Sequence, residues 1–302
     1  MRELVVLGTA SQVPTRTRNH NGYLLRWDGT GLLFDPGEGT QRQLLFAGVP
    51  ASAVTHICLT HAHGDHCLGV PGVVQRMGLD GVRREVPLLY PAEATEQVTA
   101  LLAATAHVPL TPVLHRPVRP PATVATGTDW TLTARALDHR VPTVGYRLQE
   151  ADGRRMLPDR LERWGINGPD VGRLAREGSL TVRGTTVRLD DVSAPRRGQV
   201  FAFVMDTRWC DGAVDVAAGA DLLVCESTYL ERDRALAEEH AHLTARQAGE
   251  LARAAGARRL VLTHYSQRYG DDPQPFVDEA RAVFDDVVAA VDLQRVSMPP
   301  RR

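Results

Sequence analysis

Short apolar runs bounded by Gly, Pro and Asp alternate along the chain with segments in which apolar residues recur every three to four positions. The short runs predict strands at Glu3–Leu7, Tyr23–Arg26, Leu32–Phe34, Val54–Leu59, Pro87–Tyr90, Trp130–Leu137, Val144–Leu148, Val200–Val204, Leu222–Cys225, Arg259–Leu262 and Val287–Val291. The periodic segments predict helices at Thr40–Phe46, Glu93–Thr105, Thr244–Ala255 and Pro275–Phe284. Strands interspersed with helices predict an α/β protein with two sheets covered by helices.

The segment Gln149–Gln199 differs from the rest of the chain. It carries the turn signals Asp-Gly, Leu-Pro-Asp, Asn-Gly-Pro and Ala-Pro, and it is rich in arginine. Because it separates two strongly predicted strands, we expect one domain over residues 1–302 with an inserted arm at residues 149–199.

Composition limits the classes of protein to consider. A hydrophobic fraction of 43% and a charged fraction of 24% are typical of a globular protein. No apolar run reaches the roughly 20 residues that a membrane span needs, and the first residues lack the features of a signal peptide, so we expect a cytoplasmic protein. The net charge of −1 gives no global indication of nucleic-acid binding. Four well-separated cysteines without a C-x-x-C pair indicate reduced thiols.

The run His61-Ala62-His63-Gly64-Asp65-His66 follows a predicted strand and predicts a metal site. Histidine nitrogens and carboxylate oxygens are ordinary zinc ligands. Four such groups in six residues exceed what one tetrahedral ion needs beside an open position, which favours two ions about 3.5–4 Å apart. The alternative is a polar loop that contains these residues by chance. Cys67 adjoins the run but is a weaker candidate than His66.

Three further candidates lie far along the chain, each at the end of an apolar strand. They are His139, Asp206 and His264. Each one alone is compatible with a hydrogen-bonded histidine or a capping aspartate. Together they predict partners that complete the metal site, since strand ends commonly present functional side chains.

These residues together resemble the metallo-β-lactamase fold superfamily and, within it, the ribonuclease Z family of tRNA 3′-processing endonucleases. The resemblance covers nearly the whole chain and includes four signature segments, at Phe34–Gln41, Leu137–Pro142, Asp206–Arg208 and Leu262–Tyr269. It implies an αββα sandwich, in which two packed mixed β-sheets are flanked by helices and an arm is inserted. It also implies a homodimer.

The resemblance implies a ligand set for two Zn²⁺ per subunit. One ion would be held by His61, His63 and His139, and the other by Asp65, His66 and His264. Asp206 would bridge the two ions.

Two segments resemble further motifs of the family. Pro14–Asn19 resembles its P-x-K-x-R-N loop, with arginine in place of lysine, which implies that Arg16, Arg18 and Asn19 contact RNA; a solvated basic turn is the alternative. Cys225–Thr228 and Ala241–Thr244 resemble the H-E-A-T and H-S-T segments, with Cys225 replacing a histidine and Leu243 a serine. His242 would then be a catalytic acid supported by Glu226. Without the family, the nearby His240 is an equal candidate.

The segment 149–199 resembles in position the arm with which the family holds tRNA, and Gly168-Pro169 resembles its Gly-Pro pattern. The implied phosphate contacts are Arg154, Arg155, Arg160, Arg163, Arg173 and Arg176. An ordinary surface insertion is the alternative.

The implied activity is zinc-dependent removal of the 3′ trailer from precursor tRNA, leaving a 3′-hydroxyl on the tRNA and a 5′-phosphate on the trailer. Asp65 would orient the attacking water and accept its proton, and His242 would protonate the leaving 3′ oxygen. A small-molecule hydrolase of the same fold, acting on lactones, thioesters or phosphodiesters, is the first alternative, and it would need neither arm nor basic loop. A catalytically silent RNA-binding member is the second, against which the full ligand set argues.

Overall fold

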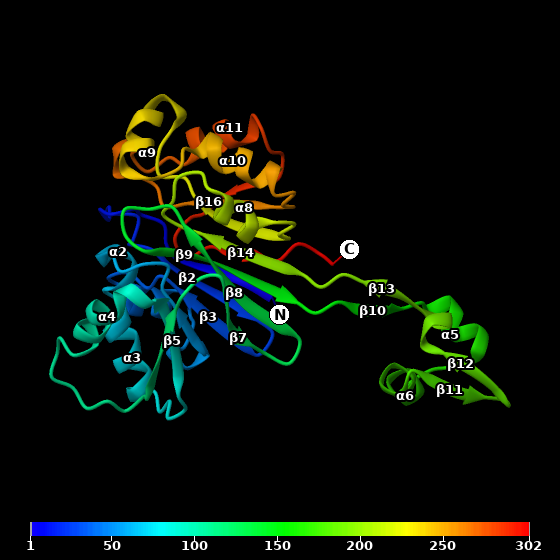
Figure 1. Ribbon diagram of the computed structural model, residues 1–302. Coiled ribbons are helices and arrows are strands. Elements are labelled where there is room, and N and C mark those ends of the chain that lie inside the picture. Colours follow the sequence, from blue (N-terminus) through cyan, green and yellow to red (C-terminus); the bar gives the residue numbers. More distant parts are fainter. Residues whose placement is uncertain (1, 302) are drawn as a thin grey trace. The chain divides into compact units, whose positions relative to one another are not determined.

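The computed structural model describes residues 2–301, which divide into two compact units. The first unit, here called the sandwich unit, comprises residues 2–148 and 200–299. The second, the arm unit, comprises residues 149–199 with residues 300 and 301. The sandwich unit contains two seven-stranded mixed sheets with helices on their outer faces, which confirms the predicted α/β class with two sheets (Figure 1).

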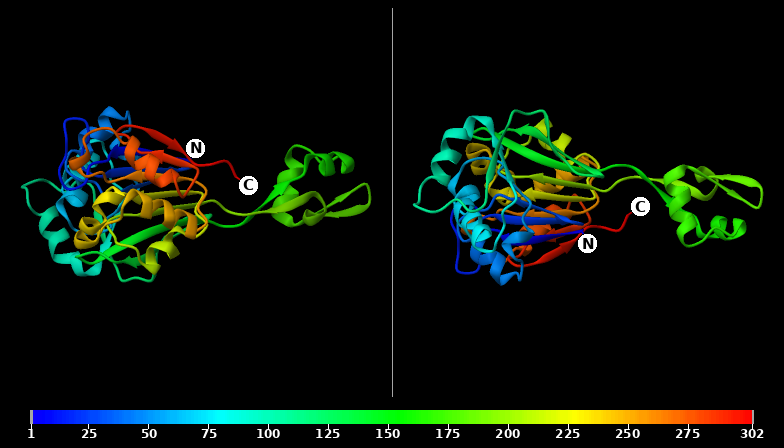
Figure 2. Two further views of the ribbon diagram at one scale, coloured as in Figure 1. Left: turned by 90° about the horizontal axis from the view of Figure 1, so that it is seen from above. Right: turned by 90° about the horizontal axis from the view of Figure 1, so that it is seen from below.

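The first sheet contains both ends of the sandwich unit, since β18 pairs with β1 (red beside blue in Figure 2). Its order is β18 (Arg295–Ser297), β1 (Arg2–Gly8), β2 (Gly22–Trp27), β3 (Thr30–Phe34), β4 (His56–Cys58), β5 (Val86–Pro91) and β6 (Val113–Val118). The strands from β18 to β3 pair antiparallel, and those from β3 to β6 pair parallel.

The second sheet is built from the later part of the chain. Its order is β17 (Val287–Ala289), β16 (Leu260–Thr263), β15 (Leu222–Glu226), β14 (Val200–Val204), β9 (Thr143–Glu150), β8 (Trp130–Leu137) and β7 (Ala122–Thr126). The strands from β14 to β17 are parallel neighbours, so their carboxyl ends meet at one edge. Such an edge is where open α/β sheets place their binding sites.

The core between the sheets follows from the alternation of side chains along each strand. In β1, Leu4 and Val6 face the other sheet, while Val5 and Leu7 face the helices, and all four are fully buried. Aromatic rings fill the middle of this layer, where Phe34 stacks on Phe203 with ring centroids 4.7 Å apart. The packing holds the two sheets face to face and thereby brings their strand ends together.

Helices cover both outer faces of the sandwich (Figure 1). Over the first sheet lie α1 (Thr40–Phe46), α2 (Gly64–Cys67), α3 (Val70–Leu79) and α4 (Thr95–Leu102). Over the second lie α8 (Asp211–Ala217), α9 (Arg234–His240), α10 (Ala245–Ala254) and α11 (Gln274–Arg281). Thr244 caps α10 and forms a capping box with Gln247, which fixes where the chain turns into that helix.

The arm unit has a small core of its own. The unit consists of the antiparallel pair β10 (Gly153–Met156) and β13 (Ser193–Arg196), the hairpin β11 (Ser179–Val182) and β12 (Thr185–Arg188), and helices α5 (Pro158–Trp164), α6 (Pro169–Glu177) and α7 (Leu189–Val192). Its buried side chains are Leu161, Ile166, Leu174, Leu180, Val187 and Val192. Among residues 2–301, no helix has both the length and the apolar composition that crossing a bilayer requires.

The structure also contains elements that the apolar pattern did not predict. Among the α-helices and strands they are α2, α3, α8, α9, β6, β7 and β18 in the sandwich unit and all elements of the arm unit. Several predicted elements are shorter than expected, most of all the helix at Glu93–Thr105, which spans Thr95–Leu102, and the strand at Val54–Leu59, which spans His56–Cys58.

Candidate metal centre

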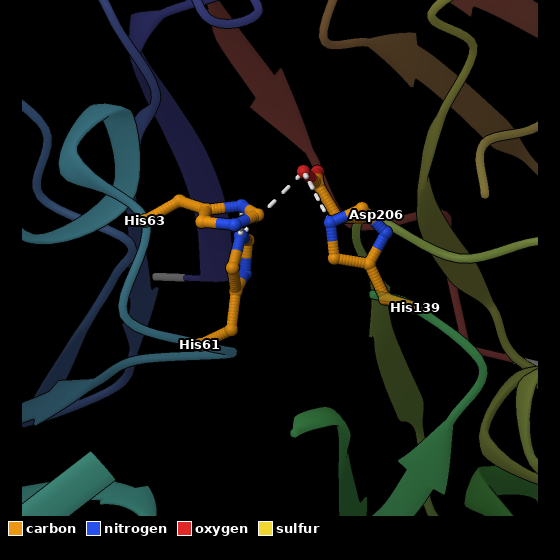
Figure 3. A group of neighbouring side chains, drawn as sticks. All are labelled: His61, His63, His139 and Asp206. Atoms are coloured by element: carbon orange, nitrogen blue, oxygen red, sulfur yellow. Dashed lines mark hydrogen bonds and ion pairs between the residues drawn. The ribbon is translucent and has the colours of Figure 1, made fainter. Parts of the chain in front are cut away.

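The candidate ligands converge from both sheets at one edge of the sandwich. The His61–His66 run follows β4, and His139, Asp206 and His264 follow β8, β14 and β16. Three groups of potential ligand atoms form there, each with all atoms within 4.8 Å of one another, and the third consists of His242 with Asp206 and His264 of the other two. The first consists of His61, His63, His139 and Asp206 (Figure 3), and the second of Asp65, His66 and His264. The structure thus brings together all seven residues that the sequence singled out.

Asp206 lies between the two groups. Its Oδ2 is 3.6 Å from His61 Nε2 and 3.8 Å from His139 Nε2. The same oxygen is 3.4 Å from His66 Nε2, and Oδ1 is 3.1 Å from His264 Nε2. Each carboxylate oxygen therefore faces imidazole nitrogens, which is the arrangement expected of a residue that serves both groups.

Two threonines fix which ring nitrogen faces the centre. Thr60 donates its hydroxyl proton to Asp35 Oδ2 at 2.7 Å, so its oxygen accepts from His61 Nδ1 at 3.0 Å. In the same way Thr228 donates to Glu226 at 2.6 Å and accepts from His264 Nδ1 at 2.7 Å. Because Nδ1 carries the proton in both rings, Nε2 presents a lone pair to the centre, as a metal ligand must.

The other rings are oriented by backbone and carboxylate groups. His139 Nδ1 donates to the Ala241 carbonyl at 3.0 Å, and His66 Nδ1 lies 3.0 Å from Asp35 Oδ2. Asp35, fully buried, also accepts the Thr60 amide at 2.7 Å. Asp35 lies in the signature segment Phe34–Gln41, but no role was predicted for it. It directly follows a buried strand that pairs with β4, and this position is what could have indicated a contact with the ligands after β4.

The inner atoms of the site lack partners. Among the described residues 2–301, His139 Nε2, His264 Nε2 and Asp206 Oδ1 are buried and accept or donate no hydrogen bond. Buried polar atoms are rarely left unpaired, since each costs about 1–3 kcal/mol. Asp206 and His264 also have φ values of 44° and 63°, which non-glycine residues rarely adopt. Unpartnered nitrogen and oxygen donors on strained backbone fit a bound metal ion.

Charge in the site points the same way. Burial opposes ionisation of Asp206, but the imidazoles of His264 and His66 hold its pKa well below the usual value. Burial also opposes protonation of His66, yet the carboxylates of Asp206, Asp65 and Asp35 raise its pKa well above the usual value. Asp35 faces His66 Nδ1, whereas Asp65 and Asp206 face Nε2, so a cation bound at Nε2 would take the place of the second proton of the imidazolium.

His242 and Glu226 form a buried pair next to the ligands. Glu226 is fully buried and accepts His242 Nδ1 at 2.9 Å and the Thr207 amide at 2.7 Å. Burial opposes protonation of the imidazole, but the Glu226 carboxylate raises the pKa of His242 to about 9. The His242 ring centroid lies 5.4 Å from that of His264. The pair therefore holds a protonated imidazole beside the second ligand group.

The positions at which the chain departs from the family motifs face away from this pair. Cys225 and Leu243 are fully buried in the layer between the second sheet and its helices. Cys67 packs in the layer under α3, with its thiol directed at the Ala62 carbonyl, and it belongs to neither ligand group among the described residues. Cys225, Leu243 and Cys67 therefore contribute to the packing and not to the ligand groups.

The Pro14–Asn19 loop separates its two arginines by environment. Arg16 is exposed and forms no ion pair or hydrogen bond within residues 2–301. Arg18 is buried, donates to the carbonyls of Gly270 at 2.9 Å and Asp271 at 2.8 Å, and lies over the Tyr265 ring. Asn19 donates to the carbonyls of His20 and Glu38. Arg18 and Asn19 thus hold the loop in place.

The arginines of the arm unit fall into two sets. Arg154 pairs with Ser193 and Asp190, Arg160 with the Asp191 carbonyl, and Arg173 with Asp170. Arg155, Arg163 and Arg176 are exposed and have no such partner within the described residues.

A pocket of about 240 Å³ opens over the metal centre. Its walls carry ligands of both groups together with His242, the loop residues 11–13, Arg140, Tyr229, His240 and residues 266–267. The chemistry of the centre is therefore accessible from outside.

Comparison with known proteins places the chain in a family. Residues 15–141 match the model of the metallo-beta-lactamase superfamily, and residues 179–265 match that of a beta-lactamase superfamily domain. The chain is 56% identical to ribonuclease Z of Streptomyces coelicolor over 304 residues, covering 100% of this chain and 99% of that protein. The chain belongs to the ribonuclease Z family. It is also 57% identical to ribonuclease Z of Kineococcus radiotolerans, covering 100% of this chain and 96% of that protein.

Solved structures agree with this membership. The short form of human tRNase Z is similar with a TM-score of 0.70 and 25% identity, covering 99% of this chain and 100% of that one. The metallo-beta-lactamase fold protein YhfI from Bacillus subtilis, at 19% identity and a TM-score of 0.70, covers 97% of this chain and 98% of its own and shares the fold. The resemblance drawn from the motifs, the metallo-β-lactamase fold and the enzyme class, a metal-dependent hydrolase that cuts RNA, are confirmed.

Proposed function

We propose that the protein is a zinc-dependent endoribonuclease that removes the 3′ trailer of precursor tRNA, leaving a 3′-hydroxyl on the tRNA and a 5′-phosphate on the trailer. The observation that carries the proposal is the His242–Glu226 pair beside the two ligand groups, in a chain that matches ribonucleases Z along its whole length. An imidazole that keeps its proton is suited to protonate an alkoxide leaving group.

The donor set fits two zinc ions. His61, His63 and His139 would hold one, Asp65, His66 and His264 the other, and Asp206 would bridge them. Imidazole and carboxylate donors of this kind suit zinc, and a bound cation would satisfy the unpartnered inner atoms described above. When bound, such a pair of ions supplies Lewis-acid polarisation of the phosphoryl oxygens and lowers the pKa of water.

The residues of the chain then divide the proton transfers. Asp65 is ionised, since the neighbouring imidazoles outweigh its burial and lower its pKa, so it can accept a hydrogen bond from the attacking water and orient it. We also assign to Asp65 the acceptance of the proton that this water gives up. His242 donates its proton to the 3′ oxygen as the bond from phosphorus to that oxygen breaks. Glu226 keeps the imidazole oriented and charged before each turnover. Attack at phosphorus with loss of the 3′ oxygen yields the two products named above.

Mapping the cut tests the proposal. Zinc-loaded protein is incubated with a precursor tRNA labelled at its 5′ end, and the product is sized beside a sequencing ladder and tested for a 3′-hydroxyl by ligation. We expect one product ending near the discriminator nucleotide. A 3′-phosphate on that product, or no cleavage by protein that carries its metal, would contradict the proposal.

We also propose that the arm unit binds the body of the tRNA through its unpartnered arginines. Replacing Arg155, Arg163 and Arg176 by alanine is expected to weaken binding of precursor tRNA. Each lost phosphate contact should reduce the slope of log K against log salt by about 0.7–0.9. The same three substitutions at Arg154, Arg160 and Arg173 form the matched control, because these guanidinium groups already have partners inside the arm.

Filter binding at several salt concentrations measures both sets. An equal loss of affinity in the two triple variants would contradict the proposal that the unpartnered arginines bind the RNA. If neither variant loses affinity, the arm does not bind RNA. In that case deletion of residues 150–190 should leave two activities unharmed, cleavage of a small phosphodiester and cleavage of the natural substrate. That outcome is expected of a small-molecule hydrolase.

In the Pro14–Asn19 loop we assign RNA contact to Arg16 and the positioning of the loop to Arg18 and Asn19.

Asp35→Asn is expected to lower zinc affinity by about 10–100-fold, since residues that orient metal ligands contribute that much. The amide cannot accept from His66 Nδ1, the Thr60 amide and the Thr60 hydroxyl with two acceptor oxygens as the carboxylate does. Competition with a zinc chelator measures the affinity. Unchanged affinity in a folded variant would show that Asp35 serves the fold and not the metal.

We further propose that the enzyme is a homodimer with two zinc ions per subunit and that it works in the cytoplasm. Native mass spectrometry measures subunits and ions together. A single chain, or one ion per chain, would contradict the first part.

A further inference from the structure

The mouth of the pocket carries a pair of aromatic rings that the proposed chemistry does not use. Tyr229 and His240 both line the pocket, and their ring centroids lie 6.3 Å apart with an angle of 20° between the planes. Both rings are partly exposed, and neither the Tyr229 hydroxyl nor the His240 ring forms a hydrogen bond within residues 2–301. A polar aromatic pair without hydrogen-bond partners is available to a ligand.

The backbone holds Tyr229 in place although its ring is free. The Tyr229 amide donates to the Leu243 carbonyl at 3.3 Å, and its carbonyl accepts from Ala245 at 2.8 Å. These bonds tie the loop after β15 to the start of α10. Tyr229 is thereby fixed relative to His242, with the two ring centroids 6.1 Å apart.

Two cations belong to the same region. Arg140 lines the pocket together with Tyr229, and Arg268 directly follows Gln267, which also lines it. Burial raises the pKa of the Tyr229 hydroxyl, and the charges of Arg268 and Arg140 act in the opposite direction. Both guanidinium groups are exposed and have no ion pair or side-chain hydrogen bond among the described residues. A preordered aromatic face with unpaired guanidinium groups nearby is a combination that binds single-stranded nucleic acid, with bases on the ring and phosphates on the cations.

We propose that Tyr229 and His240, with Arg140 and Arg268 in the same region, form a subsite that stacks the base of the nucleotide bearing the leaving 3′ oxygen. The inference rests on the proposed function, because His242, the proposed donor to that oxygen, is the neighbour of Tyr229. Stacking offers a face to every base and reads none of them by hydrogen bonds. The subsite therefore requires a base at this nucleotide and accepts any of the four.

A substrate series tests the subsite in the zinc-loaded full-length enzyme. Precursor tRNAs carry each of the four bases, or an abasic ribose, at the last nucleotide of the mature tRNA. We expect kcat/KM to vary little among the four bases. Removal of the base should reduce it by about 5–100-fold, the factor that corresponds to one stacked base. A comparable loss for an abasic first trailer nucleotide alone would overturn the assignment.

Variants of Tyr229 test the same contact from the side of the enzyme. Tyr229→Leu is expected to reduce kcat/KM on the intact substrate by the same factor, and Tyr229→Phe to recover most of the loss. On the abasic substrate, Tyr229→Leu and the unsubstituted enzyme should be equally slow. A further loss by Tyr229→Leu on that substrate would show that the ring only supports His242, and it would overturn the proposal.

A separate binding measurement keeps the subsite testable if precursor tRNA is not the substrate. Fluorescence anisotropy of a labelled four-nucleotide RNA is measured with the zinc-loaded enzyme and with Tyr229→Leu. Weaker binding by the variant supports a base-stacking subsite even where the mapping experiment fails. Equal binding contradicts it.

Discussion

His242→Ala is expected to slow cleavage of precursor tRNA by about 10²–10⁴-fold, the contribution typical of general acid catalysis. The reason is specific to this pair. Glu226 has no exposure to solvent and holds the pKa of His242 at about 9, so the imidazole carries a proton at neutral pH and can give it to the leaving oxygen. Alanine removes the donor and leaves the zinc ligands in place. Single-turnover cleavage and zinc content, measured on the same preparation, check both parts.

Two further variants complete the test. Glu226→Gln keeps the shape of the side chain but removes its charge, so it should slow cleavage less than His242→Ala does and shift the alkaline limb of the rate profile to lower pH. His107→Ala is the control, since His107 lies far in sequence from the pocket over the metal centre, is partly exposed and, among residues 2–301, hydrogen bonds only to the Thr105 carbonyl. Loss of zinc from His242→Ala would contradict its role as an acid. It would instead make His242 a ligand of the third group, with Asp206 and His264.

The positions of the ligands could be predicted because each one follows an apolar strand. A buried strand that ends in His or Asp is visible in sequence, and the αββα arrangement brings such ends to one edge. His139, Asp206 and His264 lie more than 50 residues apart along the chain, so their meeting depends on the packing of the two sheets. The family resemblance supplied that packing, whereas the apolar pattern alone supplied only candidates.

The residues that orient the ligands could not be predicted in the same way. Thr60 and Thr228 are ordinary polar residues at strand ends, and their role arises from a chain of hydrogen bonds in which each accepts from a histidine and donates to a buried carboxylate. Arg18 is a different case. Its place in a basic loop predicts RNA contact, whereas the fold directs its guanidinium at two backbone carbonyls, which favours the positioning role proposed above.

Some elements were missed for reasons of local composition. The α3 helix contains Pro71, Gly72 and Gly78, which lower helix propensity, but Pro71 stands in the first turn, where proline is tolerated. Gly72 and Gly78 face neighbouring segments so closely that a Cβ would lie 3.1 Å from Gln41 and 2.8 Å from Leu110. The β6 strand includes the exposed residues His115, Arg116 and Pro117, as an edge strand can. Tertiary contacts decide both cases.

Asp206→Asn is expected to abolish cleavage and to reduce bound zinc below two ions per chain. Asp206 is the one side chain whose two oxygens face both ligand groups, with Oδ2 toward His61, His66 and His139 and Oδ1 toward His264. Asparagine keeps the volume but replaces one oxygen by an NH₂ group, which cannot bind a cation. The affinity should fall by more than the about 10–100-fold that the loss of an orienting residue costs.

Elemental analysis, cleavage rate and thermal unfolding with and without zinc measure the effect of Asp206→Asn. Because ligands that bind only the folded state stabilise it, zinc should raise the unfolding temperature of the unsubstituted protein by more than that of the variant. Asp80→Asn is the matched control, since Asp80 pairs with Arg76 on the surface of the sandwich unit and contributes little there. Full zinc content in Asp206→Asn with an unchanged rate would place the bridging role on another residue. Full zinc content with a lost rate would instead assign Asp206 to the chemistry and not to metal retention, because the two ion positions would then be complete without its second oxygen.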